Sequence, residues 1–195
     1  MTAISALENI HKRGLFVDHQ GKNENELISV SEVKHLQIIQ IVHYKKSTLQ
    51  IVSLNLDNLK FPEVAMQVNS NKDTRILWSG PSNWLLISTK KDILSSIQKI
   101  CDDKNFAVTD LSHSRAIIEL KGSNSKEVLK KGCPINLNEF KVNNCANSIV
   151  HGITITIDMI SNDPETFRIF ALRSFGESLH HSITDACLED GYQGI

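Results

Sequence analysis

The stretch from residue 110 to residue 137 constrains the fold of this sequence most, because it predicts strand, turn, strand, helix and helix end in direct succession. Alternation along the first strand stops at residues 112–114, and residues 115–121 then form a β-branched run that is typical of a second strand. Ser123 is placed to cap the first turn of the helix that follows, and Gly132 is typical of its end. A fold with both strands and helices is therefore expected.

Patterns before and after this stretch predict the remaining elements. Strands are expected over residues 34–43, 74–78, 84–88, 145–150, 153–160 and 166–172, and helices over residues 45–59, 89–103 and from 174 onward. The apolar residues of 45–59 fit both a helical face and strand alternation, and a helix is favoured because a turn and a second apolar set follow. Thr89 is expected to cap the second helix, and Ser174 with Glu177 forms a capping box for the last.

The order of these elements predicts an α+β fold of two similar ferredoxin-like halves, each with helices on one side of a mainly antiparallel sheet. Residues 1–32 are expected to form an arm or loop. Residues 33–195 are expected to form a single compact unit, because no Pro-, Gly- or Ser-rich linker separates the halves 33–112 and 113–195.

Composition and charge exclude several classes of function. The 21 Lys and Arg against 22 Asp and Glu give a formal charge of −1, so the sequence offers no electrostatic basis for binding nucleic acid or an anionic membrane. The beginning of the sequence lacks the regions of a signal peptide, and no apolar run spans a bilayer, so a cytoplasmic protein is expected. The four cysteines form no C-x-x-C pair and are expected to be free buried thiols rather than a zinc site.

Two groups of polar residues resemble catalytic or metal sites. Asp110, Ser112 and His113 have the residue types of a hydrolase triad, but on a strand His113 points away from the other two. Ser112 and His113 are therefore expected to form hydrogen bonds of a turn. His180 and His181 are neighbours and lie about 100° apart on a helix, so they are expected to be surface residues rather than ligands of one metal.

The predicted hairpin over residues 74–88 carries both tryptophans, Trp78 and Trp84. One interpretation makes them a stacking surface for a pterin or flavin ring. The other makes them core or interface anchors, and it is favoured because tryptophan buries a large area wherever it lies.

Several blocks of the sequence resemble the γ subunits of heterotetrameric sarcosine oxidase, in the same order. They are DLSHSRAIIELKG at 110–122, VLKKGCPINL at 128–137, FPEVA at 61–65, LWSGPSNWLL at 77–86 and FRIFALRSF at 167–175. The resemblance implies a fold like the folate-binding half of the glycine-cleavage aminomethyltransferase. The catalytic acid of that enzyme is not matched, since the adjacent pair Asp102 and Asp103 lies at a helix end in a different sequence context.

The resemblance further implies a non-catalytic subunit of an enzyme that oxidatively demethylates sarcosine to glycine and passes the one-carbon unit to tetrahydrofolate. The α, β and δ subunits would be its partners and would hold FAD, FMN, NAD, tetrahydrofolate and zinc, while this chain would bind no cofactor and no metal.

Three residues, Trp84, His113 and Arg115, are candidates for a vestigial folate pocket or a subunit interface. Arg115 is placed to pair with a glutamate-tail carboxylate if a pocket persists, whereas the missing acidic partner favours a vestigial one. Two alternatives stay open, a stand-alone folate-dependent one-carbon transfer protein and a plain α+β interaction module.

Overall fold

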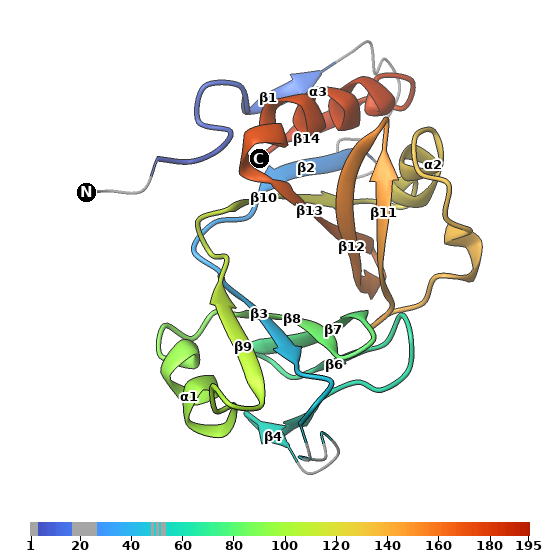
Figure 1. The fold of residues 1–195 in the computed structure, drawn as a ribbon. Helices are drawn as coiled ribbons and strands as arrows, with labels where there is room; N and C mark the ends of the chain where they lie inside the picture. Colours follow the sequence, from blue (N-terminus) through green and yellow to red (C-terminus); the bar gives the residue numbers. More distant parts are fainter. Residues whose placement is uncertain (1–3, 17–26, 48, 50, 52–53) are drawn as a thin grey trace. The chain divides into compact units, whose positions relative to one another are not determined.

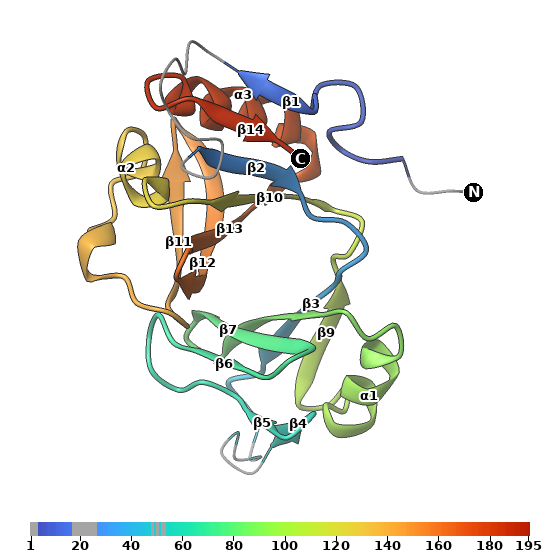
Figure 2. The same cartoon turned by 180° about the vertical axis from the view of Figure 1, so that it is seen from behind.

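The computed structural model describes residues 4–16, 27–47, 49, 51 and 54–195, and it contains two compact units. Unit 1 consists of Met1–Lys34, Ser114–Val142 and Asn147–Ile195, whereas unit 2 consists of His35–His113 and Asn143–Ala146. The two larger sheets are drawn in Figures 1 and 2. In sequence, unit 2 is therefore inserted into unit 1.

Unit 2 contains a five-stranded antiparallel sheet with the order β6-β7-β8-β3-β9. Its core gathers Ile39 and Ile41 from the sheet with Ile93 and Ile97 from the one helix of this unit in the described residues. Side chains that alternate on the strands and recur at helical spacing on the helix meet in this core, so the predicted hairpin over residues 74–88 and the helix after it are confirmed. The bounds are β3 Gln37–His43, β6 Val68–Ser70, β7 Thr74–Gly80, β8 Asn83–Ser88, α1 Ile93–Ile100 and β9 Phe106–Asp110.

The predicted helix over residues 45–59 is wrong in the part that the structure describes. Residues 48, 50, 52 and 53 lie outside the described residues, and the rest contains a two-stranded hairpin of β4 Asn55–Leu56 and β5 Leu59–Lys60. Between them Asp57 and Asn58 have positive φ angles of 54° and 63°. Left-handed residues at both central positions form the turn that joins hairpin strands, and a helix cannot continue through them.

Unit 1 contains a seven-stranded sheet with the order β1-β14-β2-β10-β13-β12-β11, in which β14 and β2 are parallel. The predicted α+β class with mainly antiparallel sheets is confirmed. Helices α2 and α3 both contact β13, and Leu129, Leu179 and Ile183 are buried. The bounds are β1 Gly14–Phe16, β2 Ile28–Glu32, β10 Arg115–Lys121, α2 Ser125–Lys130, β11 Cys145–Val150, β12 Ile153–Asn162, β13 Glu165–Leu172, α3 Gly176–Cys187 and β14 Tyr192–Gly194, with short 3-10 helices at Leu137–Glu139 and Arg173–Phe175.

The two sheets share a topology. In unit 2 the consecutive strands β6, β7 and β8 lie side by side, and the earlier strand β3 pairs with the last of them. In unit 1 the consecutive strands β11, β12 and β13 lie side by side, and the earlier strand β10 pairs with β13. A helix follows β8 in unit 2 and β13 in unit 1, so the two units share this order of strands and helix.

The predicted capping side chains are not used. Helix α1 begins at Ile93, α2 at Ser125 and α3 at Gly176, and none of the three has a hydrogen bond from a capping side chain. Thr89 therefore lies outside α1, Ser123 lies outside α2, and Ser174 lies within the 3-10 helix Arg173–Phe175. At α1 the hydroxyls of Ser95 and Ser96 instead donate to the main-chain oxygen of Asp92.

The predicted arm over residues 1–32 is partly built into the sheet of unit 1. Strand β2 pairs with β10 on one side and with β14 on the other, and Ile28 and Val30 are buried. Residues 17–26, which include most of the predicted loop, lie outside the described residues. The pairing of β2 joins segments far apart in the sequence, so the local sequence of residues 28–32 carries no sign of it.

Candidate functional site

Trp84, the predicted aromatic site residue, lies in the core of unit 2. Its side chain is 3% exposed, its Nε1 donates a 2.8 Å hydrogen bond to the main-chain oxygen of Pro62, and its ring meets the Phe61 ring edge-on at a centroid distance of 5.3 Å. A buried indole whose N–H is bonded is typical of a core anchor. A role of Trp84 in a folate pocket or an interface stays a prediction.

Trp78 lies directly opposite Trp84 in the β7–β8 ladder and is half-buried. Both line a hollow of about 500 Å³ in unit 2, which His43 and Pro62 also line. The His43 ring lies tilted by 35° against the Phe106 ring at a centroid distance of 4.9 Å, and its Nε2 is buried without a hydrogen-bond partner among the described residues. The lining mixes apolar side chains with the polar residues Ser47, Glu63 and Ser82, and these lining residues include no pair of opposite charges.

Ser112 and His113 form the turn that closes unit 2. Ser112 Oγ donates a 2.5 Å hydrogen bond to Asp110 Oδ1, Ser112 N donates to the same oxygen at 2.9 Å, and Ser112 Oγ accepts from Ile38 N at 3.0 Å. The bonds from Ser112 hold the pKa of the Asp110 carboxyl below its usual value. The expectation that Ser112 forms turn hydrogen bonds is confirmed, while the His113 side chain is exposed.

Arg115 is the first residue of β10 in unit 1, so it belongs to a different unit from His113. Its Nη1 donates to Ser114 Oγ at 3.1 Å, and burial lowers the pKa of the guanidinium from its usual value. Ser114 is neutral, so this bond does not compensate the charge of Arg115. A carboxylate ligand for Arg115 stays a prediction.

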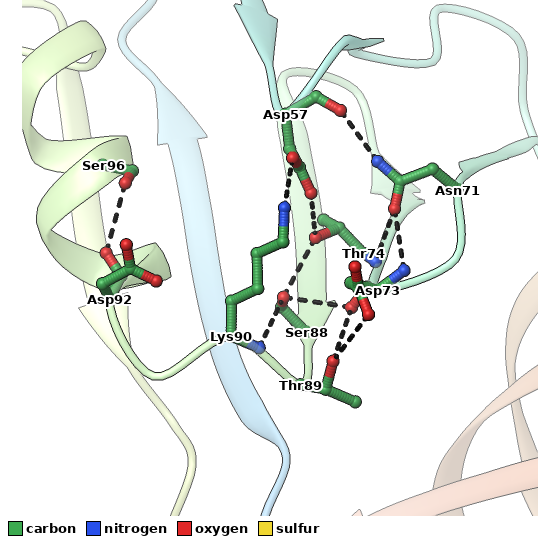
Figure 3. Close-up of polar contacts among 9 residues, drawn as sticks. All are labelled: Asp57, Asn71, Asp73, Thr74, Ser88, Thr89, Lys90, Asp92 and Ser96. Carbon is green, nitrogen blue, oxygen red and sulfur yellow. Dashed lines mark hydrogen bonds and ion pairs between the residues drawn. The ribbon is translucent and has the colours of Figure 1, made fainter.

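A network of polar side chains that sequence reasoning missed joins three turns of unit 2 (Figure 3). Lys90 Nζ donates to Asp57 Oδ1 at 2.5 Å, Thr74 Oγ1 donates to Asp57 Oδ2 at 2.7 Å, and Thr74 Oγ1 lies 2.9 Å from Ser88 Oγ. Asn71 Nδ2 donates to the main-chain oxygen of Asp57 at 2.7 Å. We call these residues the Asp57–Lys90 network.

The direction of the hydroxyl bonds in this network follows from its ends. A carboxylate only accepts, so the Thr74 proton points to Asp57. The single Ser88 proton then has two acceptors, Thr74 Oγ1 at 2.9 Å and the main-chain oxygen of Asp73 at 3.1 Å. Ser88 Oγ in turn accepts from the main-chain N of Lys90 at 3.1 Å. The chain of bonds thus begins at Lys90 N and ends on the carboxylate that Lys90 Nζ also binds.

The hydrogen bonds of the Asp57–Lys90 network favour the charged forms of Asp57 and Lys90. The hydrogen bond from Lys90 first, and that from Thr74 second, hold the pKa of the Asp57 carboxyl below its usual value, and the same bond raises the pKa of Lys90. Thr74 and Ser88 are buried. The hydroxyls of Thr74 and Ser88 both take part in these hydrogen bonds. The network therefore holds the turns together and leaves no activated nucleophile.

Replacing Thr74 by valine is expected to lower the free energy of unfolding by about 1–3 kcal/mol, because the Asp57 carboxylate then loses the hydrogen bond that Thr74 Oγ1 donates. Thr74→Ser keeps the hydroxyl and is the matched control, with an expected loss of about 1 kcal/mol for the missing methyl group. Urea unfolding of both variants measures the difference. Equal stability of the valine and serine variants would rule out the hydrogen bond from Thr74 to Asp57 as a source of stability.

His180 is buried, so the prediction that both adjacent histidines are surface residues is wrong for it and right for the exposed His181. His180 Nε2 lies 3.1 Å from His11 Nδ1, and the two rings meet edge-on at 5.3 Å. Burial, and then the charge of His11, lower the pKa of His180 to about 4. Sequence gave no signal for this pair because its members are 169 residues apart.

The four cysteines are free and buried, as predicted. Burial raises the pKa of the Cys101 and Cys187 thiols to about 12, so both stay protonated and unreactive at neutral pH. Asp102 accepts hydrogen bonds from the main-chain N of Lys104 and of Asn105, each at 3.0 Å, and so forms a turn. Neither the thiols nor this carboxylate has the surroundings of a catalytic group.

Within the part of the chain that the structure describes, no three His, Cys, Asp or Glu side chains gather as metal ligands. Among the same residues, no helix has the length and hydrophobicity needed to cross a membrane.

A sequence model of the sarcosine oxidase, gamma subunit family matches residues 48–189. The chain belongs to this family. The gamma subunit of sarcosine oxidase from Corynebacterium sp. strain U-96 is 31% identical to it over 130 residues, which cover 65% of this chain and 61% of that protein. The chain thus matches about three-fifths of the length of this gamma subunit.

Solved structures agree with the fold of this gamma subunit family member. A chain of the heterotetrameric sarcosine oxidase from Corynebacterium sp. U-96, in complex with pyrrole 2-carboxylate, superposes with a TM-score of 0.76 at 24% identity, over 86% of this chain and 87% of that chain. The glycine cleavage system aminomethyltransferase T from Bartonella henselae superposes with a TM-score of 0.61 at 12% identity, over 82% of this chain and 46% of that chain. The fold implied by the sequence resemblance is confirmed.

Proposed function

We propose that this chain is the non-catalytic γ subunit of a heterotetrameric sarcosine oxidase, which oxidatively demethylates sarcosine to glycine and passes the one-carbon unit to tetrahydrofolate. The observation that carries the proposal is the family match, which runs through segments of both units from residue 48 to residue 189. A subunit of such a complex works in the cytoplasm beside α, β and δ chains.

The chemistry of the polar residues supports a structural role. Asp57 and Lys90 bind each other, Ser112 binds Asp110, and the thiols of Cys101 and Cys187 are held protonated by burial. Groups used in this way are not available as nucleophile or general base. The FAD, FMN, NAD, tetrahydrofolate and zinc of the reaction would accordingly be held by the partner subunits, and this chain would contribute packing surface to them.

Assembly tests the proposal directly. We expect the tagged chain, purified alone, to be colourless and to form no hydrogen peroxide with sarcosine. Co-expressed with the α, β and δ chains of the same genome, it should retain a yellow, flavin-containing complex that oxidises sarcosine. Omitting the tagged chain from the same co-expression is the control, and activity or yield of the complex should fall.

Two results would count against the proposal. A monodisperse chain that fails to retain the flavin-containing partners would exclude the subunit role. Saturable binding of tetrahydrofolate to the isolated chain in calorimetry, lost in Arg115→Ala but kept in the exposed control Arg13→Ala, would instead favour a stand-alone folate-dependent transfer protein.

A further inference from the structure

Residues 4–16 pack along the rest of unit 1 and contact it at several points; we call them the strap. Leu7 is fully buried, Phe16 stacks on Tyr192 at 4.7 Å, and β1 pairs with β14. The Ser5 hydroxyl binds the Glu32 carboxylate, and the Arg173 guanidinium binds the main-chain oxygen of Ile4. Figure 2 shows β1 beside β14 at the edge of the sheet.

His11 lies in the middle of the strap and makes contacts through both of its ring nitrogens. His11 Nε2 lies 2.8 Å from the main-chain oxygen of Ile195, and His11 Nδ1 lies 3.1 Å from His180 Nε2 on α3. A carbonyl oxygen only accepts, so His11 Nε2 carries a proton. In the neutral pair His11 Nδ1 is therefore the acceptor, and His180 Nε2 is the donor.

The pair tolerates one added proton but not two. With one proton on His11, both of its nitrogens donate, and His180 accepts at Nε2 after moving its own proton to Nδ1. With a second proton on His180, two N–H groups and two positive charges face each other across 3.1 Å. The contact then changes from a hydrogen bond into a like-charge repulsion.

Charged groups of both signs surround the two rings. Glu32 on β2 favours the charged form of His180, whereas His11 and His181 oppose it, and burial opposes it most. The hollow on the His11 side is lined by charges of both signs, from Glu8, Arg13, Glu32 and Lys34. The hollow on the His180 side has Lys12, Glu177 and His181.

Both hollows lie directly beside the histidine pair. They measure about 310 Å³ and about 290 Å³, and between them they are lined by residues of the strap, α3, β2 and β14. Solvent-sized space beside both imidazoles gives protons access to them.

At two glycines the strap lies directly on unit 1. A Cβ added at Gly194 would lie 2.1 Å from the main-chain oxygen of Lys12, and one added at Gly176 would lie 3.4 Å from Ala6 and from Leu7. The closed strap is therefore compatible only with glycine at position 194.

We propose that residues 4–16 form an acid-released strap, in which double protonation of His11 and His180 detaches the segment from α3 and β14. Release uncovers the site beside Gly176 that Leu7 fills, together with the outer edge of β14. Unpaired strand edges and apolar sockets are surfaces that other chains bind.

Hydrogen–deuterium exchange of the full chain, with peptides resolved after digestion, tests the release between neutral pH and about pH 4. After correction for the intrinsic pH dependence of exchange, peptides from the strap should exchange at least roughly tenfold faster in acid, while those from β10 and β13 stay protected. His180→Gln removes the second charge, so its strap should stay protected, and His181→Gln, the exposed neighbour, should behave as wild type. Gly194→Ala should open the strap already at neutral pH.

The proposal fails if the straps of wild type and His180→Gln open at the same pH, or if the strap stays protected in acid. It also fails if strap, β10 and β13 lose protection together, because the strap is then not a separate element. Protection of the strap in Gly194→Ala at neutral pH would contradict the close contact on which the proposal rests.

Discussion

Replacing Trp84 by alanine is expected to lower the free energy of unfolding of unit 2 by about 3–5 kcal/mol, the usual cost of removing a buried aromatic side chain. The indole is 3% exposed, and it packs against Phe61 while its N–H binds Pro62. The variant therefore leaves a cavity in the core and removes the hydrogen bond that Pro62 accepts.

The chain contains its own control for this prediction. Trp78 is the other tryptophan of the chain and lies opposite Trp84 on the neighbouring strand, but it is half-buried. Trp78→Ala should cost clearly less than Trp84→Ala. Urea unfolding followed by the fluorescence of the remaining tryptophan reports on unit 2 in both variants. Equal losses, or an unchanged midpoint in Trp84→Ala, would contradict the assignment of Trp84 to the core.

The stability of the chain is expected to fall as the pH is lowered from about 6.5 toward about 4, with His180 contributing on the order of 3 kcal/mol. The pKa of His180 is lowered to about 4 in the folded chain, while an unfolded histidine titrates near 6.5. Between these values the unfolded state binds more protons than the folded state. Protons therefore favour unfolding, and the contribution of His180 is fully present only above the higher value.

Denaturant unfolding over this pH range measures the slope. His180→Gln should flatten the dependence relative to wild type, whatever its stability at neutral pH, because glutamine does not titrate. His181→Gln changes a neighbouring but exposed histidine and should leave the slope close to that of wild type. Parallel curves for all three proteins would show that His180 titrates alike in the folded and unfolded states.

Elements whose signals are local were predictable from the sequence, and those that depend on distant partners were not. The hairpin of β7 and β8 follows from two short, mainly apolar strands and the Gly-Pro-Ser-Asn turn between them. Residues 45–59 contained two compatible periodicities, and the choice depended on the left-handed pair Asp57 and Asn58. That pair is the stronger signal, because hairpin turns favour Asn and Asp at these positions.

The same distinction holds for the candidate sites. The burial of Trp84 was expected from the large area that tryptophan buries. Alternation does not indicate it, because β8 is buried continuously from Trp84 to Ser88. The contact of Lys90 with Asp57 and the contact of His180 with His11 join residues 33 and 169 positions apart. Neither pair lies at a helical or strand spacing, so periodicity cannot reveal them.

The position of β2 between β10 and β14 has a consequence for the order in which the chain folds during synthesis. Residues 28–32 leave the ribosome early, but their first sheet partner is the segment around Ile118 and their second is around Tyr192. All of residues 35–113 of unit 2 are made before either partner exists. The buried Ile28 and Val30 must therefore stay exposed, or be shielded by another chain such as a chaperone, until β10 has been made.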